Sequence, residues 1–151
     1  MIYVIDHKDS FTHNVVHQLS LFDQVLCDDF SKVSKSKLNQ ASTIVFSPGP
    51  GSPKDYPISS KIYKKFKGKK EIIGICLGFQ QILFCEGASI VEQKKIYHGF
   101  QSEVLVNNSS KLFNNGQKFK VGRYHSCLLY TSDAADDSLR VDLGGRRIIK
   151  K

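Results

Sequence analysis

Glu71-Ile72-Ile73-Gly74-Ile75-Cys76-Leu77-Gly78 is the stretch of sequence that decides the fold. Residues 71–75 form a short apolar run typical of a buried strand, and residues 77–85 carry apolar side chains at helical spacing. Cys76 is therefore predicted at a turn from strand to helix. The glycines around it permit backbone conformations that a Cβ atom would block, and the N-terminus of a helix favours a thiolate. The pattern indicates, with about equal weight, a nucleophile or the small buried cysteine that is common in protein cores.

A second loop, Ser47-Pro48-Gly49-Pro50-Gly51, follows another predicted strand at residues 43–46. Its prolines and glycines specify an irregular, exposed backbone with few side chains, and such a backbone can present N–H groups to an oxyanion. For an isolated loop of this composition, a simple surface turn is the more common interpretation. Here the loop follows a strand of the parallel type, at the sheet edge where α/β proteins place their sites, which favours a functional role.

Alternating strands and helices surround these two loops. We expect strands at residues 2–5 and 24–27, and helices at 11–22, at 35–40 and from Ile58, where Ile58, Ile62 and Phe66 form a buried stripe. In the first helix, Asp9 or Ser10 is the expected cap, and one face carries Phe11, Val15, Leu19 and Phe22. This alternation predicts an α/β fold with a parallel sheet covered by helices on both faces. After Gly87 the pattern changes to short strands, including 102–106 and 119–124, with turns near 107–108 and 114–116.

The composition fits a single globular domain with a net charge of +8 over 151 residues. The positive charge gathers around the helix from Ile58, where lysines without interleaved arginine indicate a solvated helix face rather than a nucleic-acid site: Lys61, Lys64, Lys65, Lys67, Lys69 and Lys70. The cysteines show neither metal spacing nor a paired framework, which predicts a reducing cytoplasm and no metal. His13 and His17 are four residues apart, but no third ligand accompanies them. No signal peptide or membrane span is apparent, so we expect neither a membrane nor a nucleic acid as partner.

Five segments in this order resemble the class I, or triad, glutamine amidotransferases. They are Asp9-Ser10-Phe11-Thr12-x-Asn14, residues 47–51, Gly74-Ile75-Cys76-Leu77-Gly78-x-Gln80, His98-Gly99, and Arg123-Tyr124-His125-Ser126. The first segment points to the branch that handles chorismate, which contains the small subunit of anthranilate synthase and the amidotransferase subunit of aminodeoxychorismate synthase. The resemblance covers residues 1–126 and implies a flavodoxin-like fold.

The resemblance also implies a role for each site residue. Cys76 would attack the carboxamide carbon of glutamine, and water would hydrolyse the resulting γ-glutamyl thioester. Backbone N–H groups near Gly51 and Leu77 would hold the oxyanion. The implied glutamine site comprises Gly49, Pro50, Gly51, Gln80 and Ser126, and the implied site-shaping residues are His98, Gly99, Tyr124 and His125. Phe79 stands where the family usually has histidine, and we expect only a local change in packing there.

The resemblance implies no cofactor and one protein partner. Ammonia would pass to a chorismate-binding synthase large subunit in a hetero-oligomer, for tryptophan or folate synthesis. Another cysteine hydrolase with the same turn, such as a γ-glutamyl hydrolase, is an alternative that residues 9–12 count against. A further alternative is a catalytically inactive fragment that binds glutamine or its partner.

That last alternative arises because the sequence contains no His-Pro-Glu segment, from which the family takes its catalytic histidine and glutamate. Residues 127–137 match the translation of a transposon mosaic end joined to a sequencing adaptor, and residues 141–151 match the reverse strand of a flow-cell adaptor. We therefore expect an amidotransferase domain at 1–126, truncated at its C-terminus, and a non-native tail at 127–151. A divergent natural C-terminus is the alternative.

Overall fold

The computed structural model describes the backbone of residues 1–110 and 113–130, and the side chains of these residues except 92–98 and 125–130. The chain falls into two compact units, one built on Met1–Val91 and the other on Glu92–Ser126. The two loops singled out from the sequence both lie in the first unit. The predicted tail from residue 131 onward lies outside the described residues, and residues 127–130 continue the last described strand.

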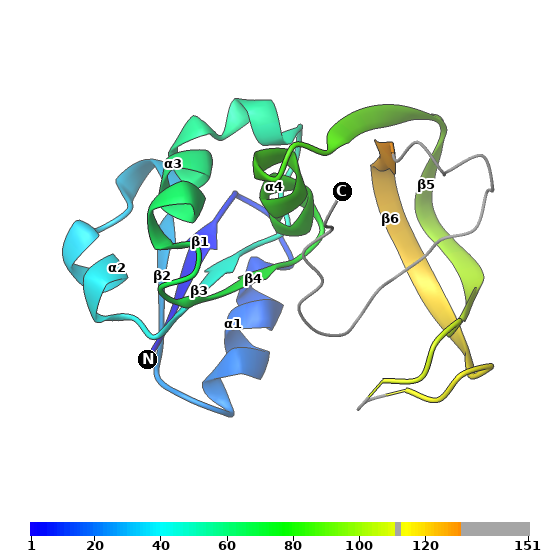
Figure 1. The fold of residues 1–151 in the computed structure, drawn as a ribbon, viewed down its shortest axis with the longest axis horizontal. Coiled ribbons are helices and arrows are strands. Elements are labelled where there is room, and N and C mark those ends of the chain that lie inside the picture. The colour runs from blue at the N-terminus through cyan, green and yellow to red at the C-terminus, as the bar shows by residue number, and fades with distance from the viewer. Residues whose placement is uncertain (111–112, 131–151) are drawn as a thin grey trace. The chain divides into compact units, whose positions relative to one another are not determined.

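A four-stranded parallel sheet forms the centre of the first unit (Figure 1). Its strands stand in the order β2-β1-β3-β4, and each adjacent pair runs parallel. This is the order in which a flavodoxin-like sheet begins. The predicted α/β fold with a parallel sheet is therefore confirmed. The strand bounds are β1, Ile2–Asp6; β2, Val25–Asp29; β3, Thr43–Phe46; and β4, Glu71–Gly74.

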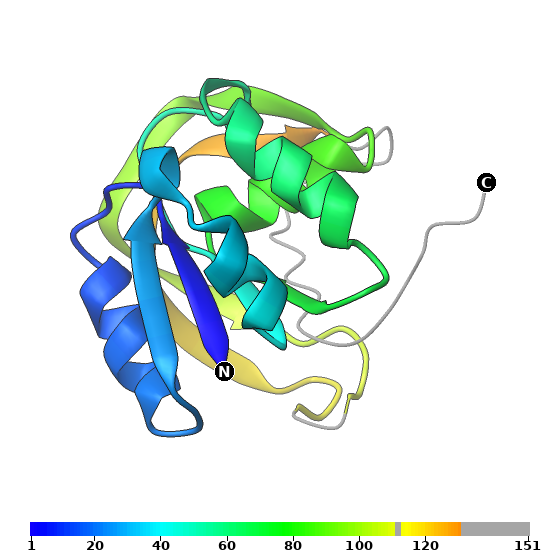
Figure 2. The ribbon, with the colours of Figure 1, turned by 90° about the vertical axis from the view of Figure 1, so that its left-hand side faces the viewer.

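Helices cover both faces of this sheet, as the sequence predicted. Helix α1 lies on one side, and helices α2 and α3 lie on the other (Figure 2). Helix α4 follows β4 directly and packs beside α3. The helix bounds are α1, Thr12–Ser20; α2, Lys35–Gln40; α3, Pro57–Phe66; and α4, Leu77–Cys85, with short 3₁₀ turns at Phe30–Lys32 and Pro53–Asp55.

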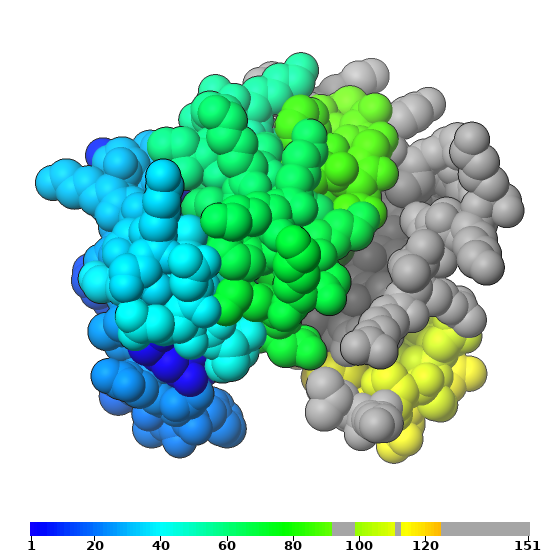
Figure 3. All heavy atoms as spheres, turned by 60° about the vertical axis from the view of Figure 1, so that its left-hand side comes forward, coloured from blue at the N-terminus to red at the C-terminus, as the bar shows by residue number. Residues whose placement is uncertain are grey.

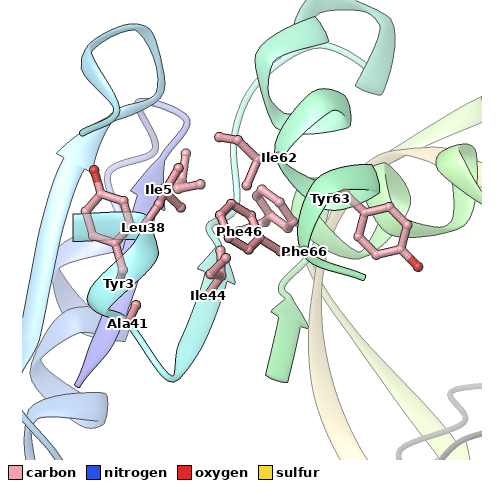
Figure 4. Close-up of a cluster of buried hydrophobic side chains, with 9 residues drawn as sticks. All are labelled: Tyr3, Ile5, Leu38, Ala41, Ile44, Phe46, Ile62, Tyr63 and Phe66. Atoms are coloured by element: carbon pink, nitrogen blue, oxygen red, sulfur yellow. The ribbon is translucent and has the colours of Figure 1, made fainter. Parts of the chain in front are cut away.

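The two faces of the sheet are filled by alternate residues of the same strands. Successive side chains of a strand point to opposite faces, so a strand buried on both sides is apolar throughout. Tyr3 and Ile5 face α2 and α3, whereas Ile2 and Val4 face α1. Figure 4 shows the larger cluster, which comprises Tyr3, Ile5, Leu38, Ala41, Ile44, Phe46, Ile62, Tyr63 and Phe66.

Some details of the first and third helices differ from the prediction. Helix α1 spans only Thr12–Ser20, so Phe11 precedes it and Phe22 follows it, and their side chains are 57% and 83% exposed. Neither Asp9 nor Ser10 caps this helix, because Phe11 occupies the cap position and the Asp9 carboxylate instead accepts the Phe11 N–H at 2.8 Å within a turn. In α3, Ile58 is partly exposed because it lies in the first turn, while the rest of the stripe is buried.

The lysine-rich surface is a solvated helix face, as predicted. Figure 3 shows α2 and α3 side by side as neighbouring cyan and green regions of one surface. Five of the six lysines are exposed. Lys67 pairs with Glu86, and Lys70 donates to the carbonyl oxygens at the C-terminal end of α2, so part of this charge has a structural role. Among the helices of the described residues, none is both long and apolar enough to cross a membrane.

The second unit is built on the greater part of two long strands, which form a two-stranded sheet. Strand β5 spans Ser89–Leu105 and β6 spans Lys118–Tyr130, so both extend well beyond the predicted short strands. The predicted turns lie between them, where the Val106 N–H donates to the Gln117 carbonyl at 2.9 Å. The rings of Phe113 and Phe119 meet edge to face at 5.1 Å and support this end of the sheet.

Candidate active site

Cys76 occupies a strained turn between β4 and α4. Its backbone dihedral angles are φ 52° and ψ −108°, a conformation that residues with a Cβ atom rarely adopt. Lys8 is the other non-glycine residue with positive φ in the described part of the chain. The Cys76 side chain is exposed. An exposed cysteine on a strained strand-to-helix turn is the arrangement of a nucleophile elbow, and such strain concentrates at functional sites.

The glycines on either side allow this turn to form. A Cβ atom on Gly78 would lie 2.1 Å from the carbonyl oxygen of Phe46, so the first turn of α4 packs directly on the end of β3. A Cβ atom on Gly74 would lie 2.5 Å from the backbone of Gly78. The predicted reason for these glycines, a close backbone approach, is therefore confirmed.

The first turn of α4 leaves a backbone donor beside the cysteine. The Gly78 N–H donates to the Ile75 carbonyl at 3.0 Å, and the Gln80 N–H donates to the Cys76 carbonyl at 3.0 Å. Within the described residues, the Leu77 N–H finds no acceptor, as is common for the first residues of a helix. Gln80 is half-buried on α4, four residues after Cys76, which itself precedes the helix.

The loop of residues 47–51 leaves β3 beside this elbow. Gly51 has φ 74°, a left-handed conformation that suits glycine, and its N–H also finds no acceptor among the described residues. The Asp55 carboxylate accepts the Ser52 N–H at 2.8 Å and closes the loop. The Tyr56 hydroxyl donates to the Pro50 carbonyl at 2.9 Å. The loop is thus a fixed structure with backbone donors available.

Gly49 joins the loop to the elbow. A Cβ atom on Gly49 would lie 2.6 Å from Cδ2 of Leu77, the residue after Cys76. The structure therefore places the loop against Leu77, the residue that follows Cys76. The oxyanion role expected of Gly51 and Leu77 stays a prediction.

The remaining predicted site residues lie on the two strands of the second unit. A Cβ atom on Gly99, which has φ 73°, would be 3.5 Å from the Tyr124 hydroxyl oxygen. His98 belongs to β5, and His125 and Ser126 belong to β6, but their side chains lie outside the described residues. The roles expected of these residues stay predictions.

His7 is a buried residue beside the loop that the sequence analysis did not select. It is fully buried directly after β1, and burial lowers its pKa. Its Nδ1 lies 3.2 Å from the Ser47 carbonyl oxygen and its Nε2 lies 2.8 Å from Ser59 Oγ. The only feature of the sequence that could have selected His7 is its place at the end of a predicted buried strand. Asp9 lies two residues after His7, the spacing at which glutamate follows histidine in a His-Pro-Glu segment. The Asp9 carboxylate, however, accepts the Phe11 N–H.

The other described cysteines differ from Cys76 in exposure. Cys27 and Cys85 are half-buried, and burial raises the pKa of the Cys27 thiol to about 11, which disfavours a nucleophilic thiolate there. Phe79, at the position of the family histidine, is 44% exposed on α4. Within the described residues, no cluster of three or more His, Cys, Asp or Glu could hold a metal ion.

Residues 3–143 match the family described as Glutamine amidotransferase class-I. The chain belongs to this family. This class-I amidotransferase is 36% identical over 141 residues to anthranilate synthase component 2 of Lactococcus lactis, a match that covers 91% of this chain and 70% of the relative. It is 35% identical over 132 residues to anthranilate synthase component 2 of Cyanidium caldarium, covering 85% of this chain and 68% of the relative.

Solved structures agree with this assignment. A protein from Thermoplasma acidophilum named as part of a GMP synthase matches with a TM-score of 0.69 and 25% identity, over 85% of this chain and 65% of that one. A glutamine amidotransferase from Thermotoga maritima matches with a TM-score of 0.65 and 17% identity, over 85% of this chain and 61% of that one, and shares the fold. The class-I amidotransferase described here thus spans less than two thirds of these solved chains.

Proposed function

We propose that this class-I amidotransferase uses Cys76 to take the amide nitrogen from glutamine. One observation carries the proposal: the strained turn exposes the Cys76 side chain directly before the Leu77 N–H, and the loop that packs on Leu77 carries the Gly51 N–H. Neither of these two N–H groups has an acceptor among the described residues. A carbonyl oxygen that gains negative charge during attack needs such donors. Hydrogen bonds on either side of Gly51 hold the loop that carries one of these donors, and helix α4 carries the other.

The proposed reaction has two steps. In the first, Cys76 Sγ forms a bond to the carboxamide carbon of glutamine, the carbonyl oxygen becomes an oxyanion, and the carbon–nitrogen bond then breaks. Ammonia leaves with a proton from a general acid, and a γ-glutamyl thioester remains. In the second, water adds to the thioester, which releases glutamate and regenerates the thiolate. Gln80, one turn along α4, is proposed to bind the glutamine.

We further propose that the ammonia goes to a chorismate-using synthase subunit. Two observations support this partner: the Asp9-Ser10-Phe11-Thr12 segment, and relatives named anthranilate synthase component 2. In the structure this segment forms the turn between β1 and α1, where the Thr12 hydroxyl donates to the Asp6 carboxylate at 2.8 Å. Anthranilate and aminodeoxychorismate synthesis are the two candidate products of the assembly.

The test is glutamine turnover with a component I synthase present. Glutamate and ammonia should form in equal amounts, and Cys76→Ala should abolish both, because among the described residues no other thiol occupies the elbow. Cys85→Ala is the matched control, since this cysteine lies at the far end of α4, and it should retain turnover. Turnover that survives Cys76→Ala would contradict the proposal.

A second candidate function is glutamine binding without turnover. The sequence contains no His-Pro-Glu segment, and a cysteine amidase needs an acid to protonate the departing ammonia. This candidate predicts that glutamine raises the melting temperature of the chain, since a ligand that binds only the folded state stabilises it. It also predicts no release of glutamate. Stabilisation together with glutamate release would favour the first proposal over this one.

A further inference from the structure

His7 lies directly beneath the loop of residues 47–51. Strands β1 and β3 pair in parallel, so His7 and Ser47 leave neighbouring strands at the same edge of the sheet. The Ser47 N–H donates to the Ile5 carbonyl at 3.1 Å, and the His7 N–H donates to Ser47 Oγ at 2.9 Å. Ser47, the first residue of the loop, is therefore hydrogen-bonded to the backbone of Ile5 and of His7, on both sides of Asp6.

The ring of His7 fixes the same residue through a defined tautomer. Nδ1 lies 3.2 Å from the Ser47 carbonyl oxygen and 3.3 Å from Ser47 Oγ. The Ser47 hydroxyl donates to the Pro48 carbonyl at 2.6 Å and a carbonyl oxygen can only accept, so both contacts are satisfied when Nδ1 carries the proton. Nε2 then accepts from the Ser59 hydroxyl at 2.8 Å. The neutral ring satisfies both contacts, and burial lowers the pKa of His7, which keeps the ring in this form.

The middle of the loop rests on Cβ of His7, and the end of the loop is tied to the His7 ring through Tyr56. A Cβ atom on Gly49 would lie 2.5 Å from Cβ of His7 and 2.6 Å from Cδ2 of Leu77, so the loop is held between His7 and the elbow. The Tyr56 ring meets the His7 ring edge to face at 4.7 Å. Because the Tyr56 hydroxyl also donates to the Pro50 carbonyl, displacement of His7 would release the loop at three points.

We propose that His7 is a positioning residue, which holds the Gly51 N–H in place for the carbonyl oxygen of a primary carboxamide bound at Cys76. His7 acts through Ser47, Gly49 and Tyr56 and need not touch the substrate. The inference rests on the proposed function, since it assigns His7 to the oxyanion site of that reaction. Donors aimed at a developing oxyanion are effective only when they are fixed before the reaction, which is what this contact network provides.

The test compares two electrophiles on Cys76 in the full chain. A chloroketone analogue of glutamine depends on the oxyanion site, because the thiolate adds to its carbonyl group before chloride leaves. Iodoacetamide alkylates the thiolate by direct displacement of iodide and develops no oxyanion. The ratio of the two rates, measured by mass spectrometry of the Cys76 peptide, therefore reports on the loop independently of thiol exposure.

Three variants of His7 separate a positioning role from simple packing. His7→Asn keeps an N–H near the place of Nδ1, whereas His7→Gln reaches toward Ser59 and His7→Leu keeps only volume. The chloroketone to iodoacetamide ratio should fall at least about tenfold in His7→Gln and His7→Leu, and should stay within about threefold in His7→Asn. If His7→Leu fails to fold, the difference in this ratio between His7→Gln and His7→Asn distinguishes positioning from packing.

Tyr3→Phe is the control for lost stability. It removes the hydrogen bond from the Tyr3 hydroxyl to Asp28, at 2.6 Å, without touching the loop. The chloroketone to iodoacetamide ratio of Tyr3→Phe should equal that of the wild type. An unchanged ratio in folded His7→Gln, or an equal fall in Tyr3→Phe, would overturn the inference, as would ¹⁵N NMR that places the His7 proton on Nε2. If the wild type itself reacts no faster with the glutamine chloroketone than with chloroacetone, the proposed function fails instead.

Discussion

The elbow and the loop pack against each other, but they are held in place in opposite ways. The elbow depends on the absence of side chains, since Gly74 and Gly78 let β4, α4 and the end of β3 approach at backbone distance. The loop depends on the presence of side chains, since His7, Asp55 and Tyr56 hold it by hydrogen bonds and ring contacts. The elbow should therefore fail when atoms are added, and the loop should fail when polar atoms are removed.

Gly78→Ala should have the largest effect, because it adds an atom at the tightest contact of the elbow. The new Cβ would lie 2.1 Å from the Phe46 carbonyl oxygen. The helix backbone fixes the position of the Cβ, and the oxygen belongs to the strand backbone, so neither atom can rotate away. We expect a loss of about 3 kcal/mol or more in the free energy of unfolding, measured by urea denaturation.

Gly68→Ala is the matched control for this prediction. Gly68 has φ 73° but no atom within 4 Å of its ideal Cβ position, so the substitution costs only the left-handed backbone conformation, about 1–2 kcal/mol. Equal losses in the two variants would show that the close approach at Gly78 contributes nothing beyond backbone conformation.

The strain at Cys76 gives the second prediction. Because φ is 52° at this residue, Cys76→Gly should be more stable than Cys76→Ala by about 1–2 kcal/mol, although glycine usually destabilises a folded chain. Thermal unfolding of the two variants measures the difference. A Cys76→Ala variant as stable as Cys76→Gly would mean that the turn is not strained.

The protonation of His7 gives the third prediction, which concerns the loop. Burial lowers the pKa of His7 in the folded state, so below about pH 6.5 the unfolded chain binds the proton first. The contribution to stability is complete above that pH and is lost as the pH falls toward the folded pKa, by up to about 1.4 kcal/mol per pH unit. Urea denaturation across this range measures the loss, and His7→Asn should remove it.

The groups around His7 bear on the size of this effect. The Asp6 carboxylate precedes His7 and raises the pKa of the ring, and Lys8 follows His7. Tyr56 packs against the His7 ring, and the Asp55 carboxylate lies near Tyr56. The remaining contacts, Phe30, Phe46, Ser47 and Ser59, carry no charge. A pH dependence that persists unchanged in His7→Asn would assign the loss of stability to groups other than His7.

Tyr56→Phe should have the smallest effect. It removes the hydrogen bond to the Pro50 carbonyl but keeps the ring contact with His7, so we expect a loss of about 1 kcal/mol in stability and slower chloroketone labelling of Cys76. Tyr63→Phe is the control, because it removes a similar bond to Glu86 at 2.8 Å away from the loop. If both variants slow labelling equally, the effect does not come from the loop.

Much of the fold could be predicted from the sequence because the sheet is buried on both faces. Continuous apolar runs marked β1, β3 and β4, and residues 35–40 and 77–85 were assigned to helices with the bounds that the structure shows. The exposed Phe11 and Phe22 were misplaced because helical spacing does not reveal where a helix begins and ends. The length of β5 and β6 was missed because the many polar residues in these segments give little apolar periodicity.

The elbow and the support of the loop also differed in how far the sequence could predict them. The elbow was predictable because its requirement is local, a cysteine between glycines at the end of a strand. The support of the loop was not, because His7, Ser47 and Ser59 are brought together only by the pairing of β1 with β3 and the packing of α3. No spacing in the sequence reports a contact between residues that lie 40 and 52 positions apart.

The most direct test of this account maps which cysteine reacts with a glutamine chloroketone, with and without excess glutamine. The account predicts one adduct, on Cys76, and slower labelling when glutamine is present, while Cys27 and Cys85 stay unmodified. Equal labelling of Cys27, Cys76 and Cys85, or labelling of Cys76 that glutamine does not slow, would contradict the claim that the elbow and loop form a glutamine site.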